Sequence, residues 1–365
     1  MLTVENLHCV AGNTTLSVPS FSVSPNSCHV ITGPTGCGKT LFLEALLGLN
    51  PARGLIRLDQ QEISAEPAER RGFGYVPQDL ALFPHLTVSE NIYYAIKCGH
   101  GSQDEARAHI ARLCRTTRIE HLLDRYPARL SGGEKQRVAL VRALAGGARV
   151  VLLDEPFSAL NQSLRQEIWE LLKSLQAEYQ LHILLVTHDL DEAMYLGDMI
   201  SVMQDGRLIQ SGPKQLVYER PANISVARLF GIRNLFRARL RRIDARESVL
   251  YDTPFGQDLY VWSEHLPDTV GDRDEIYFGI RSTEVMLLRR DTPLPERRNL
   301  IDGRIGGILH SGSFSNVHFR PHNSDCELEI SLNTHAFRKL NLGPAQERSV
   351  SLKEESLFVF TTQTP

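Results

Sequence analysis

The fold is decided by HVITGPTGCGKTLFLEALLGL, residues 29–49, in which a short apolar run leads into a glycine-rich loop and then a helical pattern. Residues 33–40, GPTGCGKT, fit GxxxxGK[ST] in the strand–loop–helix order that a phosphate-binding loop requires. Glycines let backbone N–H groups turn toward phosphate oxygens, and the start of the next helix adds a positive dipole end. The stretch therefore predicts an α/β fold that binds a nucleoside triphosphate.

Each position of this loop has an expected part in binding. Lys39 can reach the β- and γ-phosphates, and the Thr40 hydroxyl can coordinate Mg²⁺. The alternative is a glycine-rich turn with an incidental lysine, which the strand–loop–helix context disfavours. The residues expected to hold the phosphates through the backbone are Gly33, Pro34, Thr35, Gly36, Cys37 and Gly38.

Two carboxylates end an apolar run in RVVLLDEP, residues 149–156. In an open α/β sheet, ligands gather at the carboxyl ends of the strands, beside the phosphate loop. We therefore expect Asp154 to bind Mg²⁺ and Glu155 to orient or deprotonate an attacking water. The alternative is a solvated pair that caps the following helix.

Two polar residues follow other predicted strands. Gln78 comes after FGYV, residues 73–76, and His188 ends HILLVTH, residues 182–188. Each could contact a γ-phosphate or its attacking water, and Gln78 is also a candidate ligand of Mg²⁺. A lone Gln or His at such a place is more often a satisfied structural residue, but the joint placement of the two at strand ends favours catalytic roles.

A second anion site is predicted at LSGGEKQRVALVRAL, residues 130–144. Ser131 and Glu134 have the spacing of a capping box, so we predict a helix that begins at Ser131. Gly132 and Gly133 weaken its first turn, whereas bare backbone lets a phosphate approach closely. Because the chain has one phosphate loop, this second site would serve a partner's nucleotide. The alternative is a capped helix with a loose first turn.

In this order, GPTGCGKT, Gln78, LSGGEKQ, VVLLDEP, SALN and His188 resemble the motifs of ATP-binding-cassette (ABC) ATPases over residues 1–232. The resemblance implies a head-to-tail homodimer with two ATP molecules, each between residues 33–40 of one subunit and 131–134 of the other. It also implies that Glu155 is the general base, that His188 contacts the γ-phosphate and that Gln78 couples the nucleotide to a partner.

The sequence departs from this family in two places. SALN ends in Asn161 where the family usually has Asp, which would weaken communication between the two nucleotide sites. LHCVAGNTT, residues 7–15, offers no aromatic residue to stack on adenine, only His8 or Val10. We therefore expect base stacking, and with it the preference for ATP over GTP, to be weaker.

The sequence divides into two predicted domains. Residues 1–232 alternate short apolar runs with helical patterns, and about 86–147 predict a helical insertion without strands. Residues 233–365 place β-like runs such as EIYFGI between Gly, Pro and Asp turns. We expect an α/β P-loop NTPase domain of the ABC type, followed by a small all-β barrel that resembles OB or TOBE regulatory domains.

Composition limits the classes of function. The 365 residues carry a net charge of −3, which argues against a nucleic-acid partner. MLTVENLHCV does not resemble a signal peptide, and no run approaches the roughly 18–20 apolar residues of a membrane span. Six cysteines are scattered without a CxxC pair, as expected for reduced thiols. We expect a cytosolic chain, bound peripherally at the cytoplasmic face of the inner membrane.

PAERRGFGYVPQDLALFPHLTVSENIYYAI, residues 67–96, resembles the importer branch of the ABC family. The resemblance implies docking on integral membrane permease subunits and, indirectly, a periplasmic or extracellular substrate-binding protein. Leu80, Leu82, Phe83 and Leu86 would receive a coupling helix of the permease, or would instead be ordinary core.

The tail resembles the barrels of molybdate and tungstate importers, so a small oxyanion is the expected cargo. Sulfate, ferric iron, polyamine or sugar are alternatives, as are a non-transport ABC ATPase and a kinase-like phosphoryl transferase. Ser331, Lys353 or Ser356 could bind a regulatory oxyanion, although a purely structural barrel is favoured.

Overall fold

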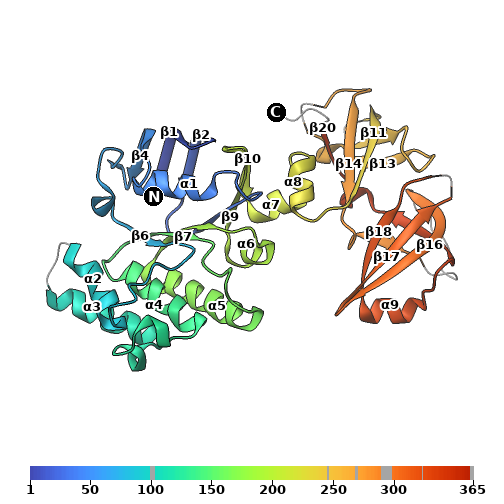
Figure 1. The fold of residues 1–365 in the computed structure, drawn as a ribbon. Helices are drawn as coiled ribbons and strands as arrows, with labels where there is room; N and C mark the ends of the chain where they lie inside the picture. Colours follow the sequence, from blue (N-terminus) through green and yellow to red (C-terminus); the bar gives the residue numbers. More distant parts are fainter. Residues whose placement is uncertain (99–102, 245, 268–269, 289–297, 323, 362–365) are drawn as a thin grey trace. The chain divides into compact units, whose positions relative to one another are not determined.

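The computed structural model describes residues 1–365 except 99–102, 245, 268–269, 289–297, 323 and 362–365. It divides into two compact units, Met1–Lys214 and Gln215–Pro365 (Figure 1). The helices α7 (Lys214–Glu219) and α8 (Ile224–Leu229) precede the first strand of the second unit. We keep residue 232, just after α8, as the proposed limit of the nucleotide-binding domain.

A six-stranded sheet forms the centre of the first unit, in the order β10–β9–β3–β8–β7–β6. All neighbours in it are parallel except β10, which runs antiparallel to β9. Every residue of β3, β7 and β8 is buried, as expected for apolar strands covered on both faces. The strands are β3 (Cys28–Thr32), β6 (Phe73–Val76), β7 (Val150–Asp154), β8 (His182–Val186), β9 (Met199–Gln204) and β10 (Arg207–Pro213).

An antiparallel sheet and helix α1 (Lys39–Leu47) cover one face of the central sheet. One apolar cluster joins Val4 of the antiparallel sheet, Phe42 of α1 and Leu184 of β8. No separate sheet was predicted for these residues. The order of this sheet is β2–β1–β4–β5, formed by β1 (Leu2–Ala11), β2 (Thr14–Val23), β4 (Ala52–Leu58) and β5 (Gln61–Glu62).

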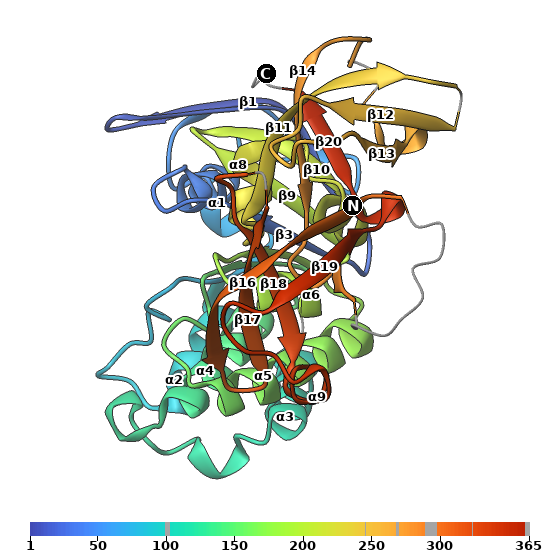
Figure 2. The same ribbon diagram turned by 90° about the vertical axis from the view of Figure 1, so that its right-hand side faces the viewer.

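Helices cover the other face of the central sheet. In Figures 1 and 2 they gather away from the antiparallel sheet, with α5 (Gln162–Tyr179) beside α4 (Gly132–Leu144). Between β6 and β7 the described residues form helices and turns without a strand, as predicted for 86–147, of which 99–102 lie outside the described residues. The remaining helices of this unit are η1 (Ala68–Arg70), α2 (Val88–Tyr94), η2 (Ala95–Cys98), α3 (Gln103–Thr117), η3 (Glu120–Leu122), η4 (Pro127–Arg129) and α6 (Leu190–Leu196).

The second unit is built from two antiparallel five-stranded sheets, which confirms the predicted all-β domain. A single apolar core joins them, with Phe278 from one sheet and Phe319 from the other fully buried. The first sheet contains β11 (Asn234–Arg242), β12 (Glu247–Tyr251), β13 (Leu259–Trp262), β14 (Glu275–Ile280) and β20 (Phe358–Thr361). The second contains β15 (Val285–Leu287), β16 (Leu300–Ser311), β17 (Phe314–Pro321), β18 (Leu328–Asn333) and β19 (Glu347–Leu352). The short helices are η5 (Ser263–His265), α9 (Thr334–Leu340) and η6 (Glu354–Ser356).

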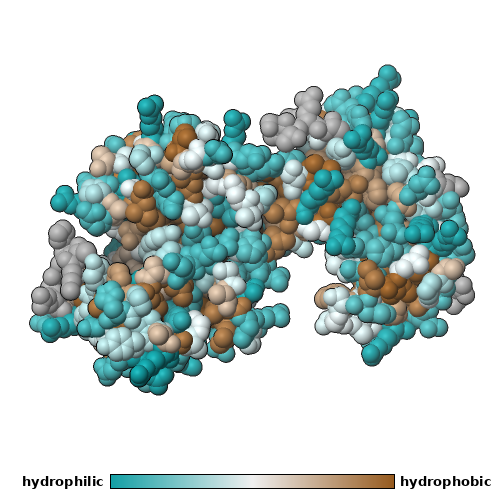
Figure 3. Space-filling view, in the orientation of Figure 1, coloured by the Kyte–Doolittle hydropathy of each residue, from teal (hydrophilic) through white to brown (hydrophobic). Residues whose placement is uncertain are grey.

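Within the described part of the chain, no helix is both long and apolar enough to cross a membrane. Hydrophilic side chains are spread over the face of both units that Figure 3 shows.

Candidate functional site

The glycine-rich loop joins β3 to α1 at the carboxyl end of the central sheet. Gly36 and Gly38 have φ angles of +81° and +105°, which residues with a side chain rarely adopt. A Cβ atom at Gly33 would lie 2.1 Å from the carbonyl oxygen of Met203, so this position admits only glycine. The N–H of Gly206 donates to the carbonyl oxygen of Cys37 at 2.9 Å and fastens the loop to the β9–β10 turn. The loop thus has the glycine-dependent backbone that a phosphate cradle needs.

Lys39 lies over this loop. Its Nζ donates to the carbonyl oxygens of Gly33 and Pro34, both at 2.9 Å, and the residue is only 6% exposed. The neighbouring Cys37 is buried, and burial raises the pKa of its thiol. The lysine is therefore the cation of the loop, while the cysteine stays a neutral part of its wall.

Asp154 closes β7 with its carboxylate inside the protein. It is 3% exposed, and its Oδ1 has no hydrogen-bond partner among the described residues. Burial raises the pKa of Asp154, while a hydrogen bond from the Thr40 side chain acts in the opposite direction. A buried carboxylate oxygen without a donor, next to a hydroxyl, suits a divalent cation, whose charge would offset the burial. Asp154 and Thr40 therefore fit Mg²⁺, whereas Gln78, after β6, is exposed.

Glu155 and His188 meet, although the sequence places them after different strands. His188 Nδ1 lies 3.1 Å from Glu155 Oε2. Glu155 has a φ of +42°, and its N–H donates to the carbonyl oxygen of Val186 at 2.9 Å. The left-handed backbone turns the Glu155 side chain away from the line of β7, toward the end of β8. The pair can therefore act as one unit, a carboxylate with an imidazole on one of its oxygens.

Ser131 is the N-cap of α4, and both bonds of the predicted capping box are present. Ser131 N–H donates to Glu134 Oε2 at 2.7 Å, and these hydrogen bonds lower the pKa of the Glu134 carboxyl. Sterics do not require glycine at the two first-turn positions. A Cβ atom at Gly132 or Gly133 would meet only Leu side-chain atoms, at 3.3 and 3.5 Å, respectively. The glycine pair is therefore not explained by packing within the chain.

The two predicted anion sites are not joined within one chain. Among the described residues, no hydrogen bond or ion pair links residues 131–134 to residues 33–40. One face of α4 is buried, with Val138 and Val141 at 0% exposed. The helix start is thus presented by a buried scaffold, with Ser131 and Gly132 exposed and Gly133 buried.

The segment after Gln78 has an unusual backbone that the sequence analysis did not predict. Leu80 and Ala81 have φ angles of +61° and +42°. Arg142, near the end of α4, donates to their carbonyl oxygens at 2.7 and 2.5 Å, respectively. The four apolar residues assigned to a coupling surface, Leu80, Leu82, Phe83 and Leu86, are all half-buried. Arg142 thus ties the helix that begins at Ser131 to this loop.

The two departures from the family pattern have structural counterparts. Asn161 is the N-cap of α5, and its Oδ1 accepts the N–H of Leu164 at 3.0 Å, as an aspartate oxygen would. His8 and Val10 both lie on the exposed face of β1, and Val10 is 59% exposed. The amide therefore keeps the helix cap, while the strand offers no aromatic ring at these two positions.

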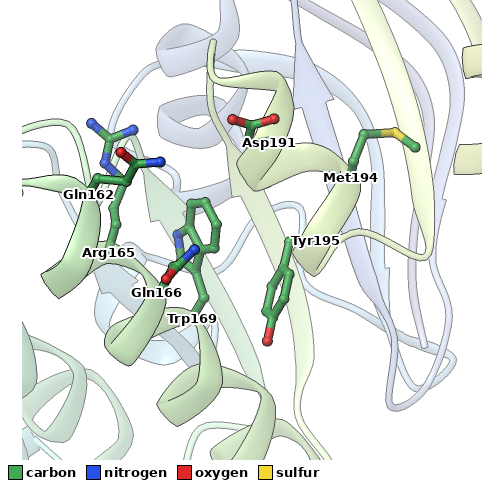
Figure 4. A pocket seen from close by; sticks show the side chains of 7 residues that line it. All are labelled: Gln162, Arg165, Gln166, Trp169, Asp191, Met194 and Tyr195. Atoms are coloured by element: carbon green, nitrogen blue, oxygen red, sulfur yellow. The ribbon is translucent and has the colours of Figure 1, made fainter. Parts of the chain in front are cut away.

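A groove of about 600 Å³ lies between α5 and α6 (Figure 4). Trp169 and Tyr195 both line it, and their rings are tilted by 32° with centroids 5.3 Å apart. Arg165 lines its edge and pairs with Asp189, the residue after His188, at 2.5 Å. Arg165 and Asp189, like Arg142, are missing from the sequence-predicted site, although Asp189 stands at a recognisable N-cap position.

In the second unit, the residues proposed for anion binding do not share a site. Ser331 donates to Asn316 Oδ1 at 3.0 Å, and Ser356 donates to Glu284 Oε2 at 3.3 Å. Lys353 lines a separate cavity of about 380 Å³ with Arg298, Glu354 and Glu355 among its neighbours. Both hydroxyls are thus engaged within the protein.

Comparisons with known proteins agree with this geometry. The ABC transporter family model matches residues 16–158. A molybdate/tungstate import ATP-binding protein of Archaeoglobus fulgidus is 44% identical over 61% of this chain and 92% of its own. One of the same description from Pyrococcus horikoshii is 30% identical over 99% of this chain and 100% of its own. A spermidine/putrescine import ATP-binding protein of Methylococcus capsulatus is 43% identical over 61% and 58%, respectively.

A solved structure shares the fold of the first unit. The ABC transporter cassette MJ0796, described as a bacterial cassette in a dimeric structure, superimposes with a TM-score of 0.52 at 27% identity. The match covers 58% of this chain and 98% of the cassette. The same cassette was also solved as a dimer in a post-hydrolysis state bound to ADP and Pi. The chain therefore belongs to the family of ABC transporter ATP-binding proteins.

Proposed function

We propose that the chain is the ATP-hydrolysing subunit of an importer for a small oxyanion, molybdate or tungstate. The cargo assignment rests on how much of this chain aligns with a molybdate/tungstate import protein. The Pyrococcus horikoshii molybdate/tungstate protein aligns with 99% of this chain, second unit included. The polyamine import relatives align with less of the chain, 61% for the Methylococcus capsulatus protein and 82% for one of Pseudomonas aeruginosa.

ATP binds at the loop between β3 and α1. The backbone N–H groups of residues 33–38 surround the phosphates, and Lys39 supplies the positive charge. Thr40, Asp154 and Gln78 would hold Mg²⁺. When bound, this ion would neutralise part of the phosphate charge. The unpartnered Oδ1 of buried Asp154 supports this assignment.

Glu155 is the general base of hydrolysis. Its carboxylate accepts a proton from the attacking water, and His188, 3.1 Å away, orients that carboxylate and contacts the γ-phosphate. The left-handed backbone of Glu155, held by Val186, supports a functional role because such conformations persist only where the surroundings impose them.

Two copies of the chain are needed for a complete site. Ser131, Gly132, Gly133 and Glu134 of one subunit close over the nucleotide held by residues 33–40 of the other. Three observations support this: the helix start has no bond to its own loop, its glycines lack a packing reason, and the related cassette was solved as a dimer. Glu134 already occupies part of the helix start, so a bound γ-phosphate would share the Ser131 hydroxyl with it.

The remaining partners follow from the importer assignment. The segment 80–86 docks on an integral membrane permease at the cytoplasmic face of the membrane, and a substrate-binding protein delivers the oxyanion from outside. Arg142 connects this segment to the helix that begins at Ser131, so that docking and closure over ATP are mechanically joined.

The test is uptake in a strain that lacks the gene for this chain. Uptake of labelled molybdate and tungstate should fall on deletion and return with the wild-type chain, but not with the Glu155→Gln variant. Polyamine import is the second candidate, motivated by the 43% identity to the Methylococcus capsulatus protein. Normal oxyanion uptake with lost spermidine uptake would establish that candidate and refute the oxyanion assignment.

A further inference from the structure

His188 depends on its neighbours for its position. Its side chain is 57% exposed, and its single ion-pair partner among the described residues is Glu155, at 3.1 Å. An exposed imidazole has little packing of its own to fix it. The residues on both sides, Thr187 and Asp189, are held by other side chains instead.

Thr187 is held from inside the protein by Glu192. Thr187 Oγ1 donates to Glu192 Oε2 at 2.5 Å and accepts the N–H of Asp189 at 3.0 Å. Thr187 and Glu192 are each 2% exposed. A carboxyl is rarely buried this deeply without a partner, and the partner here is the residue before His188. The chain of hydrogen bonds therefore runs from Asp189 N–H through Thr187 to Glu192 and spans His188.

Asp189 is held from the other side by α5. Arg165 Nη1 lies 2.5 Å from Asp189 Oδ2, while Asp189 Oδ1 caps α6 by accepting the N–H groups of Asp191 and Glu192 at 2.8 and 3.2 Å. Figure 4 shows Arg165 on α5 and Asp191 on α6, on either side of the groove. The turn that carries His188 is thus held on both sides, through Thr187 by the buried Glu192 and through Asp189 by Arg165.

We propose that Glu192 is a positioning residue for His188: its buried carboxyl holds Thr187, and its ionisation sets how firmly the turn is held. This inference rests on the proposed ATP hydrolysis, since His188 acts there through Glu155. Glu192 itself touches neither Glu155 nor the nucleotide loop in any described hydrogen bond, so its effect passes through the 187–189 turn.

The chemistry follows from the direction of the hydrogen bonds. An ionised carboxylate only accepts, so Thr187 must donate to it and keeps its lone pairs for the Asp189 N–H. A protonated carboxyl can donate to Thr187 and then competes with that N–H. Burial raises the pKa of Glu192 to about 7, and Asp189 adds to this. The Thr187 hydrogen bond and the charges of Arg165 and His188 oppose it. Glu192 therefore changes its ionisation near neutral pH, and its ionised form is the one that holds the 187–189 turn firmly.

The test compares three variants of the purified full chain by steady-state ATP hydrolysis across the neutral range. Glu192→Gln keeps the shape and accepts from Thr187 at every pH. Glu192→Ala removes the hold. Asp191→Asn, at the next position on the exposed face of α6, removes a carboxylate without touching Thr187.

The expected result is a change in the ratio of the wild-type kcat to the Glu192→Gln kcat. A group with a pKa near 7 goes from about one-tenth to about nine-tenths ionised between about pH 6 and pH 8, so the ratio should rise by up to about tenfold. Asp191→Asn should keep the wild-type profile. Glu192→Ala should lower kcat while KM for ATP stays within about twofold, since the nucleotide loop is untouched.

A ratio that stays flat within about twofold overturns the inference. So does a Glu192→Gln profile that matches the wild type while Glu192→Ala changes only the thermal midpoint, because that outcome assigns Glu192 a purely structural role. A wild-type chain that does not hydrolyse ATP refutes the proposed function instead, so the two failures are distinguishable. If Glu192→Ala does not fold, Glu192→Gln alone decides the question.

Discussion

Replacing Asn91 by alanine is expected to loosen the segment after Gln78 and to leave the nucleotide site intact. Asn91 lies in α2 with no exposed surface. Its Oδ1 accepts the N–H of Phe83 at 2.8 Å, and its Nδ2 donates to the carbonyl oxygens of Phe83, Leu86 and Thr87 at 3.1, 3.1 and 2.9 Å. One side chain thus bonds three backbone groups of the proposed docking segment, the Phe83 N–H and the carbonyl oxygens of Phe83 and Leu86.

The cost follows from the groups that lose their partner. Thr87 O also accepts the N–H of Asn91, and Phe83 O that of Leu86, so these two oxygens keep a bond. The Phe83 N–H and Leu86 O lose the partner described for them. A desolvated polar group without a partner costs about 1–3 kcal/mol, so two such groups give about 4 kcal/mol. For a unit of this size, about 2–4 °C per kcal/mol predicts a fall in the unfolding midpoint of about 8–16 °C.

The assay is scanning calorimetry of the full chain with and without ATP. The transition that ATP raises belongs to the first unit, because a ligand stabilises the state that binds it. Asn13→Ala, at an exposed turn between β1 and β2, is the matched control and should leave the midpoint unchanged. A fall of less than about 2 °C for Asn91→Ala would refute the hydrogen-bond argument. Loss of ATP affinity in that variant would show that the segment and the nucleotide site are not separate.

Four further outcomes are expected. Glu155→Gln should bind ATP and lower hydrolysis by about 10²–10⁴-fold; size-exclusion chromatography with ATP should show a dimer, and a fully active monomer contradicts the mechanism. Lys39→Ala should weaken nucleotide binding about 10–100-fold by titration calorimetry, since a charge-assisted hydrogen bond contributes about 1.5–3 kcal/mol; unchanged affinity would remove Lys39 from the site. Val10→Tyr should tighten ATP binding about 2–10-fold through ring stacking, and equal affinities would move the base away from β1. Glu192 binds its proton more tightly in the folded than in the unfolded chain, because burial raises its pKa from 4.5 to about 7. The protonated carboxyl therefore adds stability to the fold that is complete below the pKa of Glu192 in the unfolded chain and is lost as the pH rises through about 7. The unfolding midpoint of the wild type should thus fall with rising pH relative to that of Glu192→Gln.

The parts of the fold that the sequence predicted are those with a local physical signal. VVLLD forms β7 with every residue buried, because a strand covered on both faces must be apolar throughout. The glycine-rich loop is as local, since Gly36 and Gly38 need their left-handed backbone wherever the rest of the chain lies. The antiparallel sheet was missed because β1 pairs with β4 about 50 residues later, and no pattern in either strand names the other.

Contacts between distant residues also escaped prediction. Arg142 looks like a surface cation at the polar edge of α4, yet it donates to two carbonyl oxygens 61 and 62 residues away. Those oxygens face it only because Leu80 and Ala81 take a left-handed backbone, for which neither residue type has a preference. The sequence thus identified the residues with chemistry at the strand ends, whereas the residues that hold them in place needed the three-dimensional structure.

Three helix starts with the same spacing show where local patterns stop. Thr87 with Glu90 and Ser131 with Glu134 form capping boxes, in which the glutamate reaches back to the N-cap N–H. Asp189 with Glu192 has that spacing and also starts a helix, but Glu192 turns inward to Thr187. An N-cap aspartate satisfies the first-turn donors by itself, so its glutamate is free to serve another group. A buried acid that its own helix does not need must be explained by what it touches, and Glu192 touches the turn that carries His188.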